Sequence, residues 1–504
     1  MLETKLIINF LFFNLILTAM KKLVPLIIPL MILLLVSCTK DTLENVSMTG
    51  SGDVRTFKAA LGTVIQVLPS GGDDTDELIA AFNEAKASGP GSTVQLVQGE
   101  YHIGFVLVED YIGTFTGAGM GKTIIIPNMD LPYFDLYAQN LAPELVKFLR
   151  GNVRISKMSF RNLEGEPCPG DDLWAFLGLH DWAFIELPYL PENHKITAVV
   201  DHVEFVSNPG PAGFSPFAVQ TGIGCSGDFV WYSDLPYSRA DLTVTNCTFN
   251  ELNWAVGNLG IEEGRIVLSN NSLSTLAGIW LADNIGGSTL ISANELYTPA
   301  WGNGINITDA NYTGYDLFED KLSDGAQYEI SGNVFHALDA WGVVTIADDR
   351  KAMGIIDNNN PVLALIKSNL FDLQGSTWAG IWNWITDNAV IRNNKFTGQA
   401  KVGVYVDPRT VNSLMLGNNL SNLICASDIE WLPGFGNIYN ILLLGNDNTL
   451  VGGGNNGTYV LNLGENNVIT GAKFDNEGED PLGQTITDNY RIWKENLVNM
   501  RMHY

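Results

Sequence analysis

Aspartates recur at the ends of short apolar runs in the second half of the chain, and carboxylates spaced in this way can do chemistry. Each run opens with Gly, continues through Ile or Val, and ends at an aspartate. The aspartates are Asp283, Asp309, Asp348 with Asp349, Asp387 and Asp407. If the runs stack as neighbouring strands, equivalent carboxylates lie about 5 Å apart on adjacent strands and about 10 Å apart on alternate ones. Such a column of like charges repels itself unless a Ca²⁺ ion shares its oxygens or one member is protonated.

Two kinds of chemistry and one structural role fit these carboxylates. Glycoside hydrolases place two carboxyl groups about 5 Å apart when they retain configuration and roughly 6.5–9.5 Å apart when they invert it. The candidate catalytic residues are Asp348, Asp387, Asp407 and Arg409. An arginine there could neutralise a uronate or abstract a proton in a lyase, or form an ion pair with the aspartate before it. The candidate Ca²⁺ ligands are Asp309, Asp348 and Asp349. The structural alternative is that each aspartate caps a turn by accepting backbone N–H hydrogen bonds.

Aromatic side chains accompany these aspartates. The candidate substrate-binding residues are Trp280, Trp382, Trp384, Tyr405 and Arg350. Ile381 and Ile385 match the inward apolar positions of the other runs, so Trp382 and Trp384 are predicted to share the outer face of a strand. A Trp exposed beside carboxylates can stack on a sugar ring. Packing as an internal aromatic stack is the alternative.

An internal repeat from about residue 264 to residue 420 supplies the elements that must position these groups. Each copy contains a β-rich run, an Asn, an apolar residue two positions later, a loop and then the Gly-initiated run. The Asn residues are Asn271, Asn294, Asn333, Asn369, Asn394 and Asn418, at steps of 23, 39, 36, 25 and 24 residues. A period in the twenties with Asn and Gly turns predicts a solenoid of β coils. Asn tolerates the left-handed conformation and its amide can bond the next coil, so we assign this column to the fold.

The segment before the repeat resembles the opening of a known family. A Gly-Asp-Asp run leads to Thr75 as a helix N-cap, an amphipathic helix ends near Gly89, and a strand pair follows from Ser92. This order resembles pectate-lyase-like right-handed parallel β-helix proteins, in which the helix covers the open first coil. The resemblance implies an all-β, single-stranded right-handed parallel β-helix over residues 65–470, with a capping helix and long lateral loops. It also implies that an enzyme site lies along the first strand of each coil, but a fold does not fix a function.

Three motifs in the first half of the chain match known signatures only in part. Residues Gly117–Thr123 lack the first Gly of a P-loop and precede β-type sequence, so we expect a turn. The acidic pair at 171–172 resembles the paired aspartates of polygalacturonases, but it precedes the repeat and has no Gly-His-Gly or Arg-Ile-Lys partner. The pair at 201–202 resembles the Asp-His strand of pectate lyases, whose Asp binds Ca²⁺. The family's other signature residues are missing there, so we expect a plain coil with Val203 and Phe205 inward.

Residues 1–37 have the pattern of a targeting segment. A basic start at Met20, an apolar run and a Leu-Val-Ser-Cys sequence ending at Cys38 resemble a bacterial lipobox. This resemblance implies a lipidated Cys38 and a bacterial envelope location, on the outer membrane or cell surface, with residues 38–64 as a tether. Residues 1–19 fit a mis-assigned start codon, and an extra membrane segment is the alternative. Residues 471–504 are expected to be a tail or cap.

Composition limits the classes of function. The 504 residues include 51 Gly, 55 acidic and 28 basic residues, with a net charge of −27. This charge argues against nucleic-acid binding and disfavours polyanions unless a divalent cation or a local basic patch intervenes. Of five cysteines, Cys247 aligns with Ser272 and Val334 and is expected to be a buried free thiol. We expect a monomeric protein that binds polysaccharide, either a polysaccharide lyase or glycoside hydrolase, or a non-catalytic binding or adhesion lipoprotein.

Overall fold

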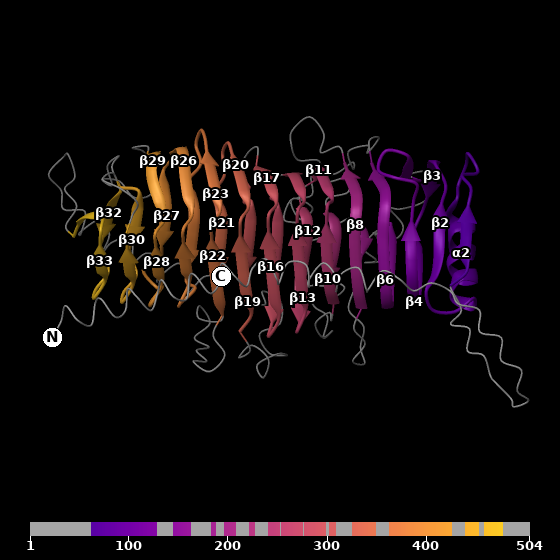
Figure 1. The fold of residues 1–504 in the computed structure, drawn as a ribbon, viewed down its shortest axis with the longest axis horizontal. Helices are drawn as coiled ribbons and strands as arrows, with labels where there is room; N and C mark the ends of the chain where they lie inside the picture. The colour runs from indigo at the N-terminus through magenta and orange to yellow at the C-terminus, as the bar shows by residue number, and fades with distance from the viewer. Residues whose placement is uncertain are drawn as a thin grey trace, which may run out of the picture. The chain divides into compact units, whose positions relative to one another are not determined.

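The chain winds into a right-handed parallel β-helix, as predicted. The computed structural model describes residues 62–128, 145–162, 183–187, 196–207, 221–226, 240–252, 254–275, 277–298, 302–308, 325–348, 362–425, 439–452 and 458–476. Figure 1 shows the strands of successive coils side by side in chain order. The first strand begins at Val64 and the last ends at Asp475, whereas the predicted limits were 65 and 470.

Each central coil contributes one strand to each of three parallel sheets. The first sheet contains the Gly-initiated runs. Its strands are β4 (Val106–Thr116, first half), β6 (Val146–Arg161, first part), β7 (Ala183–Glu186), β9 (Thr221–Ser226), β12 (Trp254–Glu262), β15 (Ile279–Ile285), β18 (Ile305–Thr308), β21 (Gly342–Ala347), β24 (Ala379–Trp384), β27 (Val402–Val406), β30 (Ile441–Leu443), β32 (Tyr459–Asn462) and β34 (Lys473–Asp475).

The second sheet follows the first along each coil. Its own strands are β1 (Val64–Val67), β2 (Ser92–Leu96), β10 (Ala240–Thr245), β13 (Arg265–Ser269), β16 (Ser288–Ser292), β19 (Gln327–Ser331), β22 (Leu363–Lys367), β25 (Val390–Arg392), β28 (Leu414–Leu416), β31 (Thr449–Val451) and β33 (Val468–Thr470). Later parts of β4 and β6 and the first part of β8 (Ile196–Val206) join it.

The third sheet closes the coil. Its own strands are β3 (Gly99–Ile103), β5 (Thr123–Pro127), β11 (Thr248–Leu252), β14 (Ser272–Thr275), β17 (Glu295–Thr298), β20 (Val334–Ala337), β23 (Leu370–Leu373), β26 (Lys395–Ala400) and β29 (Asn419–Cys425), joined by the ends of β6 and β8. Its inward phenylalanines stack from coil to coil, with ring centroids 4.8 Å apart for Phe335 and Phe371. Stacked rings of this kind fill the core between the sheets.

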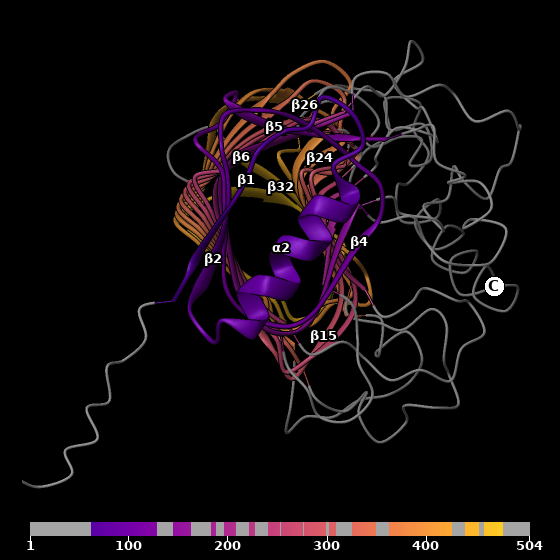
Figure 2. The ribbon, with the colours of Figure 1, turned by 90° about the vertical axis from the view of Figure 1, so that its right-hand side faces the viewer.

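The helix α2 (Thr75–Ala87) lies across the open end of the first coils (Figure 2). Phe82 is buried there, and its ring centroid lies 5.2 Å from those of Tyr111 and Phe115. The N-cap is Asp74 and not Thr75. The carboxylate of Asp74 accepts the N–H of Ser70 at 2.6 Å and of His102 at 3.1 Å, so it ties the entry chain to the third sheet. The predicted capping helix is therefore confirmed, but its N-cap residue lies one position before the predicted Thr75.

The Asn column forms a continuous ladder inside the turn between the second and third sheets. The Oδ1 atom of Asn333 accepts both the backbone N–H and the Nδ2–H of Asn294, at 2.9 and 3.0 Å. The Nδ2 of Asn333 donates to Asn369 Oδ1 and to the carbonyl oxygen of Ile291, both at 3.0 Å. The same pattern links Asn271 to Asn294 and continues from Asn369 to Asn418. The prediction of an Asn ladder is confirmed.

The left-handed residue of each turn is the one before the ladder Asn, which corrects the sequence interpretation. These residues are Asn270, Ala293, Gly332, Ser368, Asn393 and Gly417, with φ between 54° and 66°. Since the ladder Asn itself is not in this region, it is selected by its amide and not by its backbone. The preceding position accepts several residue types because it tolerates a modest strain.

Cys247 occupies the ladder position above Asn271, which corrects its predicted alignment by one residue. Thr248 pairs with Ser272, so Cys247 stands level with Asn271. The backbone N–H of Cys247 donates to Asn271 Oδ1 at 2.9 Å, and the thiol lies 3.2 Å from the carbonyl oxygen of Thr245. Cys247 is a buried free thiol, as expected. A thiol replaces an amide where the ladder begins.

Cys247 is expected to resist alkylation in the folded protein. Burial raises the pKa of its thiol to about 12. At pH 8 its thiolate fraction is then about a thousandfold below that of a thiol with an ordinary pKa near 9. Peptide mass spectrometry after iodoacetamide treatment checks this, with urea-unfolded protein as the control. Modification of Cys247 at equal rates in both samples would contradict the burial.

Candidate functional site

One row of side chains runs along the outer face of the first sheet, across five consecutive coils. This outer row consists of Trp280, Asn306, Thr345, Trp382 and Tyr405, which pair in register from β15 to β27. The adjacent residues on these strands point into the main core; they are Ile279, Leu281, Ile305, Ile307, Val344, Ile346, Ile381, Val404 and Val406. The row therefore faces away from the core, as strand alternation predicts. It contains three of the candidate substrate-binding residues.

Three members of the outer row carry buried polar atoms without a partner. Trp280 Nε1, Asn306 Oδ1 and Thr345 Oγ1 form no hydrogen bond with any residue in the described part of the chain. They are a donor, an acceptor and a hydroxyl that can do both. An unmade hydrogen bond at a buried atom costs roughly 1–3 kcal/mol, so such atoms on adjacent coils call for a ligand that can bond them. Hydroxyl groups of a sugar chain have this capacity.

The aromatic end of the row is packed more tightly than the sequence suggested. The ring centroid of Trp378 lies 4.7 Å from that of Trp382 and 5.1 Å from that of Tyr405. Tyr405 is only 1% exposed, because it belongs to a second apolar cluster with Tyr439 and Leu442 from a later coil. Tyr405 is therefore not an exposed platform, whereas Trp382 and Trp384 remain partly exposed on the outer face.

Trp384, Asp407 and Arg409 form one interacting group at the edge of the first sheet. The Asp407 carboxylate accepts Nε and Nη2 of Arg409 at 2.5 and 3.0 Å, and also the backbone N–H of Arg409 at 3.1 Å. The guanidinium carbon lies 5.6 Å from the ring centroid of Trp384, a cation–π distance. The Asp407 side chain is 3% exposed and that of Arg409 is 20% exposed. The predicted alternatives of ion pairing and turn capping are both realised here.

Asp387 and Asp348 lie in the turns that follow β24 and β21. Asp387 Oδ1 accepts the backbone N–H of Val411 at 2.7 Å, so this carboxylate caps a turn in the next coil. Asp348 is partly exposed. The carboxylates of Asp387 and Asp407 are thus engaged, with a backbone N–H and with an arginine respectively. Catalysis by Asp348, Asp387, Asp407 and Arg409 stays a prediction.

A strained residue connects Trp384 to Asp387, and no sequence signal pointed to it. Ile385 has φ of +71°, a region that β-branched residues rarely adopt and that costs roughly 1–3 kcal/mol. It forms an isolated bridge with Ala347. Asn383 holds the turn, because its amide bonds the N–H and carbonyl of Thr386 at 3.2 and 3.1 Å. Strain of this kind is maintained by surrounding contacts and is common at functional sites.

Several predicted site residues lie outside the described residues. They are Asp309, Asp349, Arg350 and Cys38, and the side chain of Asp283 is also outside them. Among the described residues, no group of three or more His, Cys, Asp or Glu side chains is arranged to hold a metal ion. The Ca²⁺ site of Asp309, Asp348 and Asp349 stays a prediction. No helix in the ranges that the structure describes is long and apolar enough to cross a membrane.

The partial motifs of the first half have structural roles where they are described. Residues 117–122 form the turn before β5, as expected. Asp201 Oδ1 accepts hydrogen bonds from Thr245 Oγ1 and Asn246 Nδ2 at 3.1 and 2.9 Å. Burial opposes ionisation of Asp201, but hydrogen bonds from Asn246, His202 and Thr245 outweigh it and lower its pKa. Val203 and Phe205 point into the core, so this segment is the expected plain coil. The pair at 171–172 lies outside the described residues.

Comparison with known proteins supports the fold. No protein-family model and no curated protein sequence matches this chain. A DFA-IIIase from Arthrobacter chlorophenolicus A6 in complex with GF2 is 14% identical with a TM-score of 0.52, over 78% of this chain and 95% of that one. The same protein in complex with DFA-III is 13% identical with a TM-score of 0.50, over the same shares. At these identities the likeness shows a shared parallel β-helix fold and no more.

Proposed function

We propose that this protein is a carbohydrate-active β-helix that binds polysaccharide along the outer row of the first sheet. The unbonded polar atoms of Trp280, Asn306 and Thr345 are the observation that carries the proposal. They lie on three adjacent coils, so a linear chain that runs along the solenoid can meet each in turn. The partly exposed indoles of Trp382 and Trp384 extend the same face and could stack on sugar rings.

The structural neighbours agree with this class of ligand. The DFA-IIIase that shares the fold is a carbohydrate-active enzyme and was solved with carbohydrate ligands. The outer row lies on the sheet where pectate-lyase-like proteins are expected to keep their sites. We further propose that the body is tethered to the bacterial envelope through a lipidated Cys38, which globomycin-sensitive processing and palmitate labelling in a bacterial host would test.

Cleavage is a second candidate function, and the strained turn at Ile385 favours it. This turn follows β24, which ends at Trp384, and it contains Asp387 three residues after Trp384. Asp348 directly follows the preceding first-sheet strand, β21, and is partly exposed, so it is the strongest candidate for proton transfer. Incubation with plant and algal polysaccharides, with and without EDTA, separates the outcomes. Unsaturated products absorbing at 235 nm indicate a lyase, new reducing ends without them indicate a hydrolase, and binding alone indicates neither.

Trp384→Ala is expected to weaken binding of the polysaccharide that the panel identifies by about tenfold, equivalent to about 1.4 kcal/mol. The reason is loss of the indole platform beside Arg409. Tyr297→Ala is the matched control, because Tyr297 is 41% exposed on the third sheet. Affinity electrophoresis or calorimetry measures both variants. Equal affinity of the Trp384 variant and the wild type would contradict polysaccharide binding on the first sheet.

A further inference from the structure

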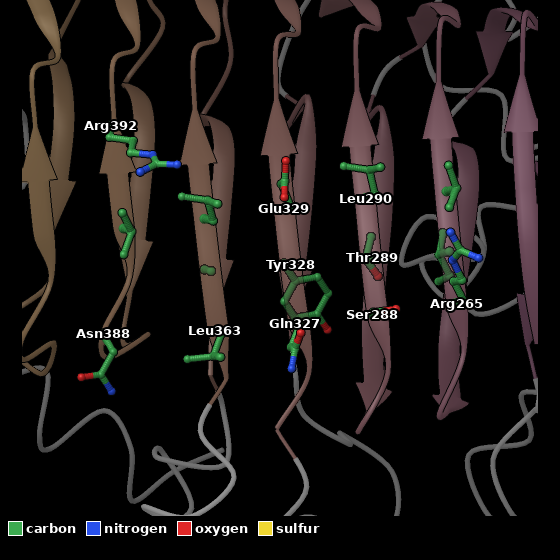
Figure 3. A pocket seen from close by; sticks show the side chains of 15 residues that line it. Arg265, Ser288, Thr289, Leu290, Gln327, Tyr328, Glu329, Leu363, Asn388 and Arg392 are labelled. Carbon is green, nitrogen blue, oxygen red and sulfur yellow. The ribbon is translucent and has the colours of Figure 1, made fainter. Parts of the chain in front are cut away.

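A groove on the outer face of the second sheet has the shape and charge of a separate binding site. It has a volume of about 580 Å³ and crosses the strands β13, β16, β19, β22 and β25. Apolar side chains form its floor; they include Val267, Leu290, Leu365 and Val390. Polar groups of Ser288, Gln327 and Asn388 line one side. Figure 3 shows Arg265 and Arg392 on opposite sides of this groove, with Gln327 and Glu329 between them.

The two arginines supply positive charge that the described residues offset only in part, through the electrostatic attraction of Glu329 for Arg392. Neither the guanidinium of Arg265 nor that of Arg392 forms an ion pair with another residue in the described ranges. Asp241 lies on β10, the strand that pairs with β13. Its carboxylate accepts a hydrogen bond from the backbone N–H of Arg265 at 2.8 Å, and the Arg265 side chain does not take part in this bond. A protein with a net charge of −27 thus places at one groove two guanidinium groups that form no salt bridge with the described residues.

A third cation, Lys367, lies beside Arg392 at one end of the groove, and the repulsion between the two charges is destabilising. Lys367 pairs directly with Arg392 in the register of β22 and β25, and like charges opposite each other are destabilising. Glu329 forms an ion pair with Lys367, with 2.8 Å between its Oε1 and Nζ. The hydrogen bond from Lys367 lowers the pKa of Glu329, so this carboxylate is ionised at neutral pH. Glu329 also attracts Arg392, so one anion is shared between two neighbouring cations, and an external anion can offset the positive charge that remains.

We propose that this groove binds a linear glycan that carries carboxylate groups, separately from the outer row of the first sheet. Guanidinium groups bind carboxylates in a two-pronged geometry, and the apolar floor with flanking amides and hydroxyls suits sugar rings. Four strand spacings separate β13 from β25, about 19 Å, so the ligand that reaches both arginines is an oligomer. The proposal rests on the proposed function in that the chain binds glycan, but it uses a different sheet and different residues.

The test uses the full-length protein without its lipid and an oligogalacturonate of defined length. A neutral glucan of equal length is the comparison ligand. Arg265→Gln with Arg392→Gln is expected to weaken oligogalacturonate binding at least tenfold, and to leave glucan binding within twofold. Binding of the wild type should fall with added NaCl, because charge pairs on a surface are screened. Glu329→Gln should strengthen binding severalfold, since it removes the groove's anion. This opposite change keeps the test valid if the arginine variant folds poorly.

Lys395→Gln with Lys473→Gln is the matched control, because these exposed lysines lie on the third and first sheets and removing them changes net charge equally. It should change oligogalacturonate binding less than twofold. An equal loss of oligogalacturonate affinity in this control would show that net charge, and not the groove, causes the effect, and would overturn the proposal. Equal binding of glucan and oligogalacturonate by the wild type, or a loss caused by Trp384→Ala alone, would also overturn it. Loss of glucan binding in Trp384→Ala with oligogalacturonate binding retained would support two separate sites.

Discussion

Replacing Asn333 with Leu is expected to destabilise the β-helix by roughly 3–9 kcal/mol. Leu is similar in volume but offers no amide. The change leaves the backbone N–H and Nδ2–H of Asn294 without their acceptor, and the carbonyl oxygen of Ile291 without its donor. Each of these groups is buried, and an unmade hydrogen bond there costs about 1–3 kcal/mol. Loss of order should spread to neighbouring coils, because each coil is stabilised by those beside it.

Urea unfolding followed by tryptophan fluorescence measures this change. Asn422→Leu is the matched control, since Asn422 is exposed on β29 and the expected change is within about 0.5 kcal/mol. Asn333→Asp tests the same bond from the other side, because Asp keeps the acceptor for Asn294 and loses the donor to Asn369. If Asn333→Leu unfolds at the same urea concentration as Asn422→Leu, the ladder does not contribute to stability.

The fold could be predicted because its requirements repeat with the chain. Every coil needs an amide at the same turn, so the Asn spacing identified the ladder from the sequence. The error at Cys247 has a related cause: Asn246 precedes it, and Asn also suits the left-handed position of the turn. Two adjacent positions with different physical requirements can hold the same residue, and spacing alone does not separate them.

The candidate site could be predicted only in part, because its geometry depends on contacts between distant coils. Strand alternation placed Trp382 and Trp384 on the outer face correctly. It could not show that Tyr405 is buried, since Tyr439 and Leu442 come from a later coil. Nor could it show that Asp387 bonds the amide of Val411, 24 residues later.

Replacing Arg409 with Met is expected to destabilise the folded protein by about 3–5 kcal/mol, the typical cost of breaking a buried ion pair from one side. The Asp407 side chain is 3% exposed and accepts two hydrogen bonds from the guanidinium. Without Arg409 its negative charge stays buried and unpaired. Urea unfolding at pH 7 measures the loss. Lys401→Met is the control, because Lys401 is a partly exposed cation in the turn before β27 without an ion pair among the described residues.

The double variant Asp407→Asn with Arg409→Met decides what this pair does. It removes both charges, so most of the stability lost in the single variant should return. If the refolded double variant still binds and processes polysaccharide like the wild type, Asp407 is a structural residue that holds Trp384 and the turn in place through Arg409. If stability returns but cleavage is abolished, the ion pair takes part in the chemistry. Asp407 then replaces Asp348 as the main candidate for the catalytic carboxylate. Failure of the double variant to regain stability would contradict the ion pair as the source of the loss.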